Sequence, residues 1–248
     1  MIDLHCHILP GVDDGAASEE ESVRMVQIAW DSGVRGIAAT PHCNVPGQFG
    51  NYASRELLER LNALRQLIQS RGIPLKLYSG MEVFVTEDFP TLLRQRKFLP
   101  LGSSRYLLME FGFGERSRFM EQMLRSAQEQ DYVPVIAHPE RYYCVQDDPE
   151  LLMDWCQSGY VIQLNKGSFS GMFGRPAART AHWALREGCM HLVGSDAHSP
   201  FVRTTRMEKI WDYLADAASV EVAAFLLREN PVAILENRRV EPIMTAFG

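Results

Sequence analysis

The sequence is poor in the features that mark disulfide-bonded, exported or membrane-inserted proteins. Its five cysteines are an odd number, and no two of them have the C-x-x-C spacing of redox and zinc motifs. No charged-then-apolar signal segment opens the chain. No apolar run approaches the roughly 20 residues that cross a bilayer. We therefore expect reduced thiols, a cytoplasmic location and no insertion into a membrane.

An excess of basic residues is also lacking. The 248 residues include 31 acidic and 25 basic ones, for a formal net charge of −6. A protein that binds phosphate backbones needs a clustered basic face, so we expect no nucleic-acid partner. The chain is 46% hydrophobic and 23% charged, which disfavours disorder, collagen-like repeats and coiled coils. The composition is that of a globular protein with a core of its own.

What is present is an alternation of short β-rich runs with amphipathic helical stretches, which is typical of a parallel sheet built from βα units. Seven rounds of about 35 residues fit the ~30 or more residues that one βαβ unit needs. No composition change marks a linker, so we expect one domain over residues 1–248. The expected strands are 2–5, 36–40, 75–80, 106–110, 133–137, 160–164 and 191–194. The helical stretches are expected to begin near Ser18, Ser54, Glu87, Arg116, Pro149, Arg175 and Arg203.

Polar side chains stand at or just past the carboxyl end of each expected strand, where a core strand has no reason to carry them. In parallel α/β folds these ends open onto one face, where barrel active sites are found. We therefore expect seven separate segments to bring imidazoles and carboxylates to one rim. The set is His5, His7, His42, Glu82, Glu110, His138, Asn165, Asp196 and His198.

Two pairs in this set have a spacing that suits a metal ion. In an extended segment the imidazoles of His5 and His7 face the same way, so one ion can bind both. Asp196 and His198 repeat this spacing near the other end of the chain. The structural alternative is a pair of histidines on the solvent face of a strand, which would produce the same string.

The single members of the set have structural alternatives too. His42 and His138 each adjoin a proline and could simply be solvated turn residues. Glu82 and Glu110 each follow an apolar run, where an unpaired carboxylate near a core would be costly. A bound metal removes that cost and favours the functional interpretation.

Asp14 is one more candidate ligand, although its Gly-Val-Asp-Asp-Gly string also fits a turn that Asp13 could cap. Nitrogen and oxygen ligands without cysteine suit Mn, Fe or Zn in a hydrolytic site. Nine candidate ligands, Asn165 excluded, exceed the needs of one ion, so we expect at least two metals, and three if a carboxylate bridges. Such ions activate water and hold both oxygens of an in-line displacement at phosphorus, so phosphoester hydrolysis is the expected reaction.

Two arginines follow ligand-bearing strands and are candidates for binding phosphate. Arg141 lies three residues after His138, and Arg203 lies five after His198. A guanidinium group can form a fork of two hydrogen bonds with phosphate oxygens. Arg206 is the substitute if Arg203 points away. The alternative is that these arginines are ordinary surface charges.

Taken in order, the motifs resemble those of one known family. They include Asp-Leu-His5-Cys-His7, Thr-Pro-His42, Gly-Met-Glu82, Leu-Met-Glu110-Phe, Ala-His138-Pro-Glu-Arg141-Tyr and Gly-Ser-Asp196-Ala-His198. The chain resembles the polymerase and histidinol phosphatase (PHP) superfamily. Within it, the chain is similar to manganese-dependent bacterial protein-tyrosine phosphatases that accompany the tyrosine kinases of capsule and exopolysaccharide synthesis. The resemblance runs from residue 1 to the C-terminal segment.

The resemblance implies an α/β fold with a distorted seven-stranded (β/α)7 TIM-like barrel and a site for three ions, with Mn as the metal and Fe or Zn as alternatives. It places Glu82 as a bridge and implies removal of phosphate from tyrosines in the tail of a partner kinase. The implied ligand sets are His5, His7, Glu82 and Asp196; Glu82, Glu110 and His138; and Asp14, His42 and His198.

The cysteines support a metal mechanism over a thiol mechanism. Cysteine-dependent tyrosine phosphatases need an arginine six positions after the nucleophilic cysteine. Those positions hold Val12, Phe49, Glu150, Ile162 and Ser195. We therefore expect a metal-bridging hydroxide as the nucleophile and no covalent phosphoenzyme.

Two other functions are compatible with the same residues. One is a small-molecule phosphoesterase, such as a histidinol phosphatase, because the metal ligands alone do not select a leaving group. The other is a non-catalytic, metal-stabilised regulatory module that binds a kinase tail. Phosphate release from a phosphotyrosine peptide, compared with small phosphates, distinguishes the three.

Overall fold

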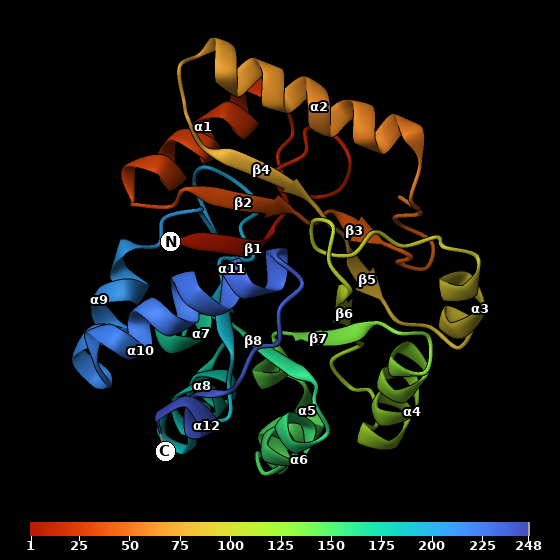
Figure 1. Ribbon diagram of the computed structural model, residues 1–248, viewed down its shortest axis with the longest axis vertical. Helices are drawn as coiled ribbons and strands as arrows, with labels where there is room; N and C mark the ends of the chain where they lie inside the picture. The colour runs from red at the N-terminus through yellow and green to blue at the C-terminus, as the bar shows by residue number, and fades with distance from the viewer. Residues whose placement is uncertain (248) are drawn as a thin grey trace.

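A computed structural model describes residues 1–247, and residue 248 of the expected 1–248 domain lies outside them. Within this part of the chain, nine parallel strands form two sheets (Figure 1). The three-stranded sheet has the order β1 (Ile2–Cys6), β2 (Gly36–Ala39) and β4 (Lys76–Ser79). The six-stranded sheet has the order β3 (His42–Cys43), β5 (Glu82–Phe84), β6 (Tyr106–Glu110), β7 (Val133–Ala137), β8 (Val161–Asn165) and β9 (Leu192–Gly194).

The strand count differs from the expected seven. A strand lies in each of the seven expected segments, but β3 and β5 are additional and follow β2 and β4 after two-residue breaks. Pro41 lies in the first break and has no N–H to donate to a ladder. In the second break, a Cβ on Gly80 would lie 3.1 Å from both Leu101 and Thr40, so a larger residue would crowd them. The chain bends at these two places, and the bends separate the two sheets.

The two sheets also meet along a second line, between β1 and the segment that follows β9. The amide of His7 donates to the carbonyl of Ala197 (2.9 Å), and the amide of Asp196 donates to the carbonyl of His5 (2.9 Å). Cys6 and Ala197 form a parallel bridge. These contacts curl the sheet, and this curled parallel α/β architecture is compatible with a TIM-like fold.

Most helices begin close to the expected positions because local capping groups are present. Ser18 accepts a hydrogen bond from the amide of Glu21 (3.3 Å) at the start of α1, and Ser54 accepts one from Leu57 (3.2 Å) at the start of α2. The helices that follow the strands are α1 (Glu19–Asp31), α2 (Arg55–Ser70), α3 (Phe89–Arg94), α4 (Ser117–Gln128), α6 (Leu151–Gln157), α8 (Arg175–Glu187) and α9 (Glu208–Ala217).

The last of these helices begins later than expected. The expected start was Arg203, but Arg203 has φ of 51°, a left-handed conformation that cannot continue into a helix. The segment up to Met207 is a loop, and α9 starts at Glu208. Arg203 therefore belongs to the loop that follows β9, which places it beside the strand ends.

Shorter helices complete the chain, and several cover the sheet (Figure 1). α11 lies against β1 and shares an apolar cluster with Tyr106, Val161 and Leu192, the first residues of their strands. α11 thus covers the amino end of the sheet and leaves the carboxyl end for polar residues. No helix within residues 1–247 is long and apolar enough to cross a membrane. The shorter helices are η1 (Pro139–Arg141), α5 (Tyr143–Asp147), α7 (Lys166–Phe169), α10 (Val220–Ala224), η2 (Phe225–Glu229), α11 (Asn230–Leu235) and α12 (Ile243–Phe247).

Candidate metal centre

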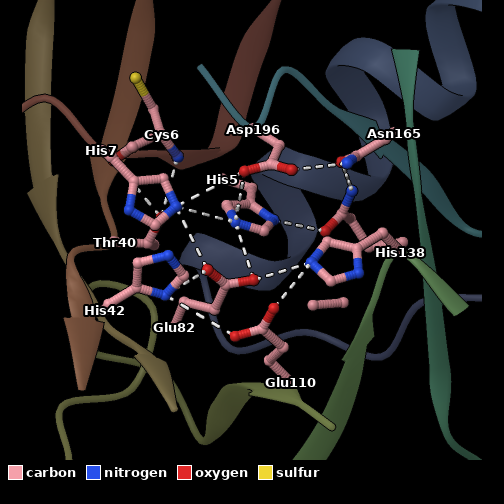
Figure 2. A network of polar contacts seen from close by, with 12 residues as sticks. His5, Cys6, His7, Thr40, His42, Glu82, Glu110, His138, Asn165 and Asp196 are labelled. Atoms are coloured by element: carbon pink, nitrogen blue, oxygen red, sulfur yellow. Dashed lines mark hydrogen bonds and ion pairs between the residues drawn. The ribbon is translucent and has the colours of Figure 1, made fainter. Parts of the chain in front are cut away.

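The expected polar side chains converge at the carboxyl ends of the strands. His42 and Glu82 follow the carboxyl ends of β2 and β4, where they begin β3 and β5 and are paired in register, and Glu110 is the last residue of β6. Figure 2 shows these groups facing one another together with residues from β1, β8 and the segments after β7 and β9. Segments far apart in the sequence therefore supply one polar cluster.

Two members of the cluster stand on left-handed backbone. His138 has φ of 35° and Asp196 has φ of 49°. Such conformations cost a non-glycine residue about 1–3 kcal/mol and are found mainly where a site requires them. His138 directly follows β7, and Asp196 comes two residues after the end of β9. The turn at each strand end directs the side chain into the cluster.

The carboxylate of Glu82 lies at the centre of the cluster and is 1% exposed. Its Oε1 atom lies 3.1 Å from His5 Nε2 and 3.0 Å from His138 Nε2. Its Oε2 atom lies 3.2 Å from His7 Nε2 and 3.1 Å from His42 Nδ1. One carboxylate thus faces four imidazole nitrogens, which is the arrangement that a bridging ligand needs.

Three groups of side chains bring potential ligand atoms within 4.8 Å of one another. The third group contains His42 where the family resemblance implied His138. His138 Nε2 nevertheless lies 3.6 Å from Glu110 Oε1, in addition to its contact with Glu82. The groups are His5, His7, Glu82 and Asp196; His7, Asp14, His42 and His198; and His42, Glu82 and Glu110.

The carboxylates of the cluster have opposite pKa shifts. Burial raises the pKa of Glu82, but the charge of His5 and the hydrogen bond from His138 outweigh it and hold the pKa well below its usual range. Burial raises the pKa of Glu110 well above its usual range, and the negative charges of Glu82 and Asp196 raise it further. Cations bound between the two glutamates would favour the ionised form of both.

A buried nitrogen in the cluster also lacks a hydrogen-bond partner. His42 Nδ1 lies 3.1 Å from Glu82 Oε2, yet the two do not form a hydrogen bond. A buried polar atom without a partner normally costs free energy, and a metal ligand is one explanation for it. The donor set of imidazoles and carboxylates without thiolate therefore fits Mn, Fe or Zn.

Two polar residues orient the histidines, and the sequence analysis did not assign them this role. Asp13 Oδ2 lies 2.7 Å from His7 Nδ1, and Gln163 Oε1 lies 2.7 Å from His5 Nδ1. Each contact occupies Nδ1 and directs Nε2 toward Glu82, as is usual for metal-binding histidines. Asp13 also accepts from the amide of Gly15 (2.9 Å), as expected for a turn cap. Gln163 could have been noticed as a polar residue inside the apolar run Val161-Ile-Gln-Leu.

Two arginines flank the cluster at Asp196. Arg203 Nη2 forms an ion pair with Asp196 Oδ2, and Arg141 Nη1 lies 3.4 Å from the same oxygen. Asn165 Nδ2 donates to this oxygen as well (2.6 Å). Arg206 instead pairs with half-buried Glu208 (2.8 Å). Of the two candidates in this loop, Arg203 and not Arg206 reaches the site.

Comparison with known proteins identifies the family. The model of the family described as "Capsular polysaccharide synthesis, CpsB/CapC" matches residues 1–236. The chain belongs to the CpsB/CapC family. This family member is 35% identical over 242 residues to the tyrosine-protein phosphatase YwqE of Bacillus subtilis, across 97% of the chain and 93% of that relative. It is 28% identical over 245 residues to the tyrosine-protein phosphatase CpsB of Streptococcus pneumoniae, across 97% of the chain and 100% of the relative.

Solved structures agree with this assignment. The fold matches a chain from the crystal structures of YwqE from Bacillus subtilis and CpsB from Streptococcus pneumoniae, described as unique metal-dependent tyrosine phosphatases. The TM-score is 0.89 at 31% identity, with 98% of each chain covered. The lactonase Lmo2620 of Listeria monocytogenes has the same fold, with a TM-score of 0.62 at 13% identity and 94% of each chain covered. The resemblance to bacterial tyrosine phosphatases noted in the sequence is confirmed.

Aromatic rings hold the arginines of this CpsB/CapC family member. The Arg141 guanidinium lies 4.5 Å from the ring centre of Phe113 and 4.3 Å from that of Phe173. The Arg203 guanidinium lies 5.6 Å from Phe173. Tyr142, another aromatic loop residue, is fully buried, and its hydroxyl donates to the carbonyl of Ala137 (2.8 Å). Tyr142 therefore packs, whereas Phe113 and Phe173 border the site.

Proposed function

We propose that this chain is a metal-dependent protein-tyrosine phosphatase whose residues 1–248 act as one phosphatase domain. Its substrate would be the phosphotyrosine tail of a bacterial tyrosine kinase that regulates capsular or exopolysaccharide synthesis. The observation that carries the proposal is the Glu82 carboxylate, which faces four imidazole nitrogens at the centre of three groups of ligand atoms. The relatives named above support the substrate class, because they are tyrosine-protein phosphatases.

The metal content proposed is three ions, with Mn favoured and Fe or Zn as alternatives. His5, His7, Glu82 and Asp196 would hold the first ion. Glu110 and His138 would join Glu82 at the second, where His42 also lies within reach, and Asp14, His42 and His198 would hold the third. When bound, such ions lower the pKa of a shared water so that it can attack phosphorus at neutral pH.

The side chains around the metal ligands would bind and orient the phosphate. Arg141 and Arg203 both direct N–H groups at Asp196 Oδ2. Because a phosphate dianion is an acceptor of the same kind, these guanidinium groups are suited to its oxygens. Phe113 and Phe173 fix the planes of the guanidinium groups, so less freedom is lost when phosphate binds.

We also propose that the curled sheet is a distorted seven-stranded barrel. In this description β2 continues into β3 and β4 continues into β5, so each pair counts as one bent strand. The hydrogen bonds between β1 and the segment after β9 would close the ring. The bends at Pro41 and Gly80 would be the distortion, and they direct His42 and Glu82 into the site.

The experiment compares phosphate release from a phosphotyrosine peptide and from histidinol phosphate. Enzyme is stripped with a chelator and reloaded with Mn. We expect rapid turnover of the peptide that depends on the metal. Replacement Glu82→Ala is expected to abolish turnover and lower the metal content, because Glu82 would be a ligand of two of the three proposed ions. Replacement Glu59→Ala, at an exposed glutamate on α2, is the matched control.

Three results would contradict the proposal. Unchanged turnover in Glu82→Ala would remove the metal centre from the reaction. Faster turnover of histidinol phosphate than of the peptide would favour a small-molecule phosphoesterase. Thermal stabilisation by metal without phosphate release from any ester would favour a regulatory module.

A further inference from the structure

A groove of ≈ 600 Å³ opens beside Arg203, outside the cluster of metal-ligand candidates. It lies between α7 with the loop that follows it, the loop before α9, and α9 itself. Much of its lining is apolar. The apolar lining includes Phe169, Met172, Phe173, Phe201, Ile210 and Tyr213.

Apolar side chains at the rim of this groove are unusually exposed. Met172 is 54% exposed, Phe201 is 66% exposed and Val202 is 69% exposed. Exposed apolar groups that are gathered in one place usually mark a binding surface, whereas single ones need no explanation. Here the three belong to two loops that both line the groove. The groove therefore has the character of a recognition site.

The charge of the groove is of one sign, in contrast to the acidic chain as a whole. Its charged lining residues are Lys166, Arg203, Arg206 and Lys209, and no acidic residue lines it. Arg206 is neutralised by Glu208, and the ammonium of Lys166 is bound to main-chain carbonyls. Lys209 forms no ion pair within residues 1–247. A ligand with an acidic group beside an apolar one would match both the apolar lining and the positive charge of the groove.

The groove is continuous with the proposed phosphate site. Arg203 lines the groove, and its guanidinium also reaches Asp196. Phe173 lines the groove and packs against the guanidinium groups of both Arg141 and Arg203. If the phosphate of a peptide lies at these arginines, a residue next to the phosphotyrosine would therefore lie over the groove.

We propose that this groove binds the peptide residues that flank the phosphotyrosine, and that it selects a large apolar side chain with an acidic residue next to it. The inference rests on the proposed phosphatase function and adds a sequence preference to it. The apolar side chain fills the space between Met172 and Phe201, and the acidic residue pairs with Lys209.

The test compares two phosphotyrosine peptides that differ only in the flanking pair, Leu-Glu or Ser-Lys, with free phosphotyrosine as the reference substrate. We expect the wild type to prefer the Leu-Glu peptide on the order of tenfold in kcat/KM, the scale of discrimination by one apolar contact. The variants Phe201→Ser and Lys209→Glu are expected to remove most of this preference. Val220→Ser replaces another exposed apolar residue, on α10, and serves as the matched control.

Each outcome separates this inference from the phosphatase proposal. Hydrolysis of both peptides with equal efficiency, or a preference that survives in Phe201→Ser and Lys209→Glu, would overturn the groove assignment and leave the phosphatase proposal standing. Phosphate release from no substrate by the Mn-loaded wild type would overturn both. A dimer in sedimentation that Phe201→Ser dissociates, with peptide preference unchanged, would assign the groove to a second copy of the chain and overturn the peptide assignment.

Discussion

The main-chain amide of His198 donates a hydrogen bond to the carbonyl of Arg203 (2.9 Å). A proposed metal ligand and a proposed phosphate-binding arginine are therefore the two ends of one closed loop. Ser199 strengthens the loop, because its hydroxyl donates to the carbonyl of Val202 (2.7 Å). A short hydrogen-bonded segment thus sets the spacing between His198 and Arg203.

Replacement Arg203→Met is expected to lower kcat/KM for a phosphotyrosine peptide about 100-fold, the size of effect seen when one donor to a developing charge is removed. Metal content should be retained, because none of the candidate ligands is replaced. Steady-state kinetics and metal analysis check both statements. Arg238→Met, at an exposed arginine paired with Glu236, is the control. Equal losses in the two variants would refute the role of Arg203.

Lys166 anchors the loop that carries Arg203. Its ammonium donates to the carbonyls of Thr204 and Arg206, the latter at 2.6 Å. Lys166→Met removes both hydrogen bonds, so we expect KM to rise about tenfold, with a smaller change in kcat, because phosphate positioning is disturbed more than the chemistry. Lys166→Arg should recover part of the loss. A variant Lys166→Met with wild-type KM would show that the loop needs no anchor.

Asp13 is expected to act through His7. Burial disfavours its charge, but the hydrogen bond and charge of His7 outweigh this and keep the pKa of Asp13 below its usual value. Asp13→Asn should weaken metal binding about 10- to 100-fold, the usual effect of removing the carboxylate behind a metal-binding histidine. Metal titration of stripped enzyme measures it, beside Asp147→Asn as an exposed control. Unaltered affinity would exclude the orienting role.

Buried His191 is expected to make the protein less stable in acid, independently of the metal centre. Burial lowers its pKa to about 3, and Nδ1 accepts from the amide of Ile162 (3.0 Å). The unfolded chain binds this proton below about pH 6.5, whereas the folded protein does not, so stability falls as the pH drops from 6.5 toward 3. At pH 5 the free energy of unfolding is expected to be about 2 kcal/mol lower than it is above pH 6.5.

Urea unfolding of metal-free protein at pH 7.5 and pH 5 tests this expectation. His191→Gln removes the titrating group, so its stability should change less between the two pH values than that of the wild type. Because every other titrating group is common to both proteins, the difference between them isolates His191. Parallel pH profiles would show that His191 is not the cause.

Cysteine alkylation is expected to leave activity intact. Burial raises the pKa of Cys43 and of Cys189 to about 12, and that of Cys6 well above its usual value. The thiol of Cys6 points away from the cluster (Figure 2). Little thiolate is therefore present near neutral pH. Treatment with iodoacetamide followed by an activity assay checks this, and inactivation in step with labelling would argue for a thiol nucleophile.

The alternation of strands and helices, and the polar residues at strand ends, could be predicted from the sequence alone. Both signals are local: a strand end is visible where an apolar run meets a histidine or carboxylate, as at Glu110 and His138. In a parallel sheet all such ends share one face, so the gathering of His5, His42 and Asp196 followed from topology alone. The extra strands β3 and β5 could not be predicted in this way, because they arise where the sheet bends.

Tertiary structure alone decided which groups support the cluster and which arginine reaches it. Both Arg203 and Arg206 follow His198 closely in the sequence, but Arg203 pairs with Asp196 whereas Arg206 pairs with Glu208. The contact of Gln163 with His5 joins residues 158 positions apart. Sequence patterns determine the period and end of each element, whereas contacts between elements depend on how their side chains pack, which no local pattern encodes.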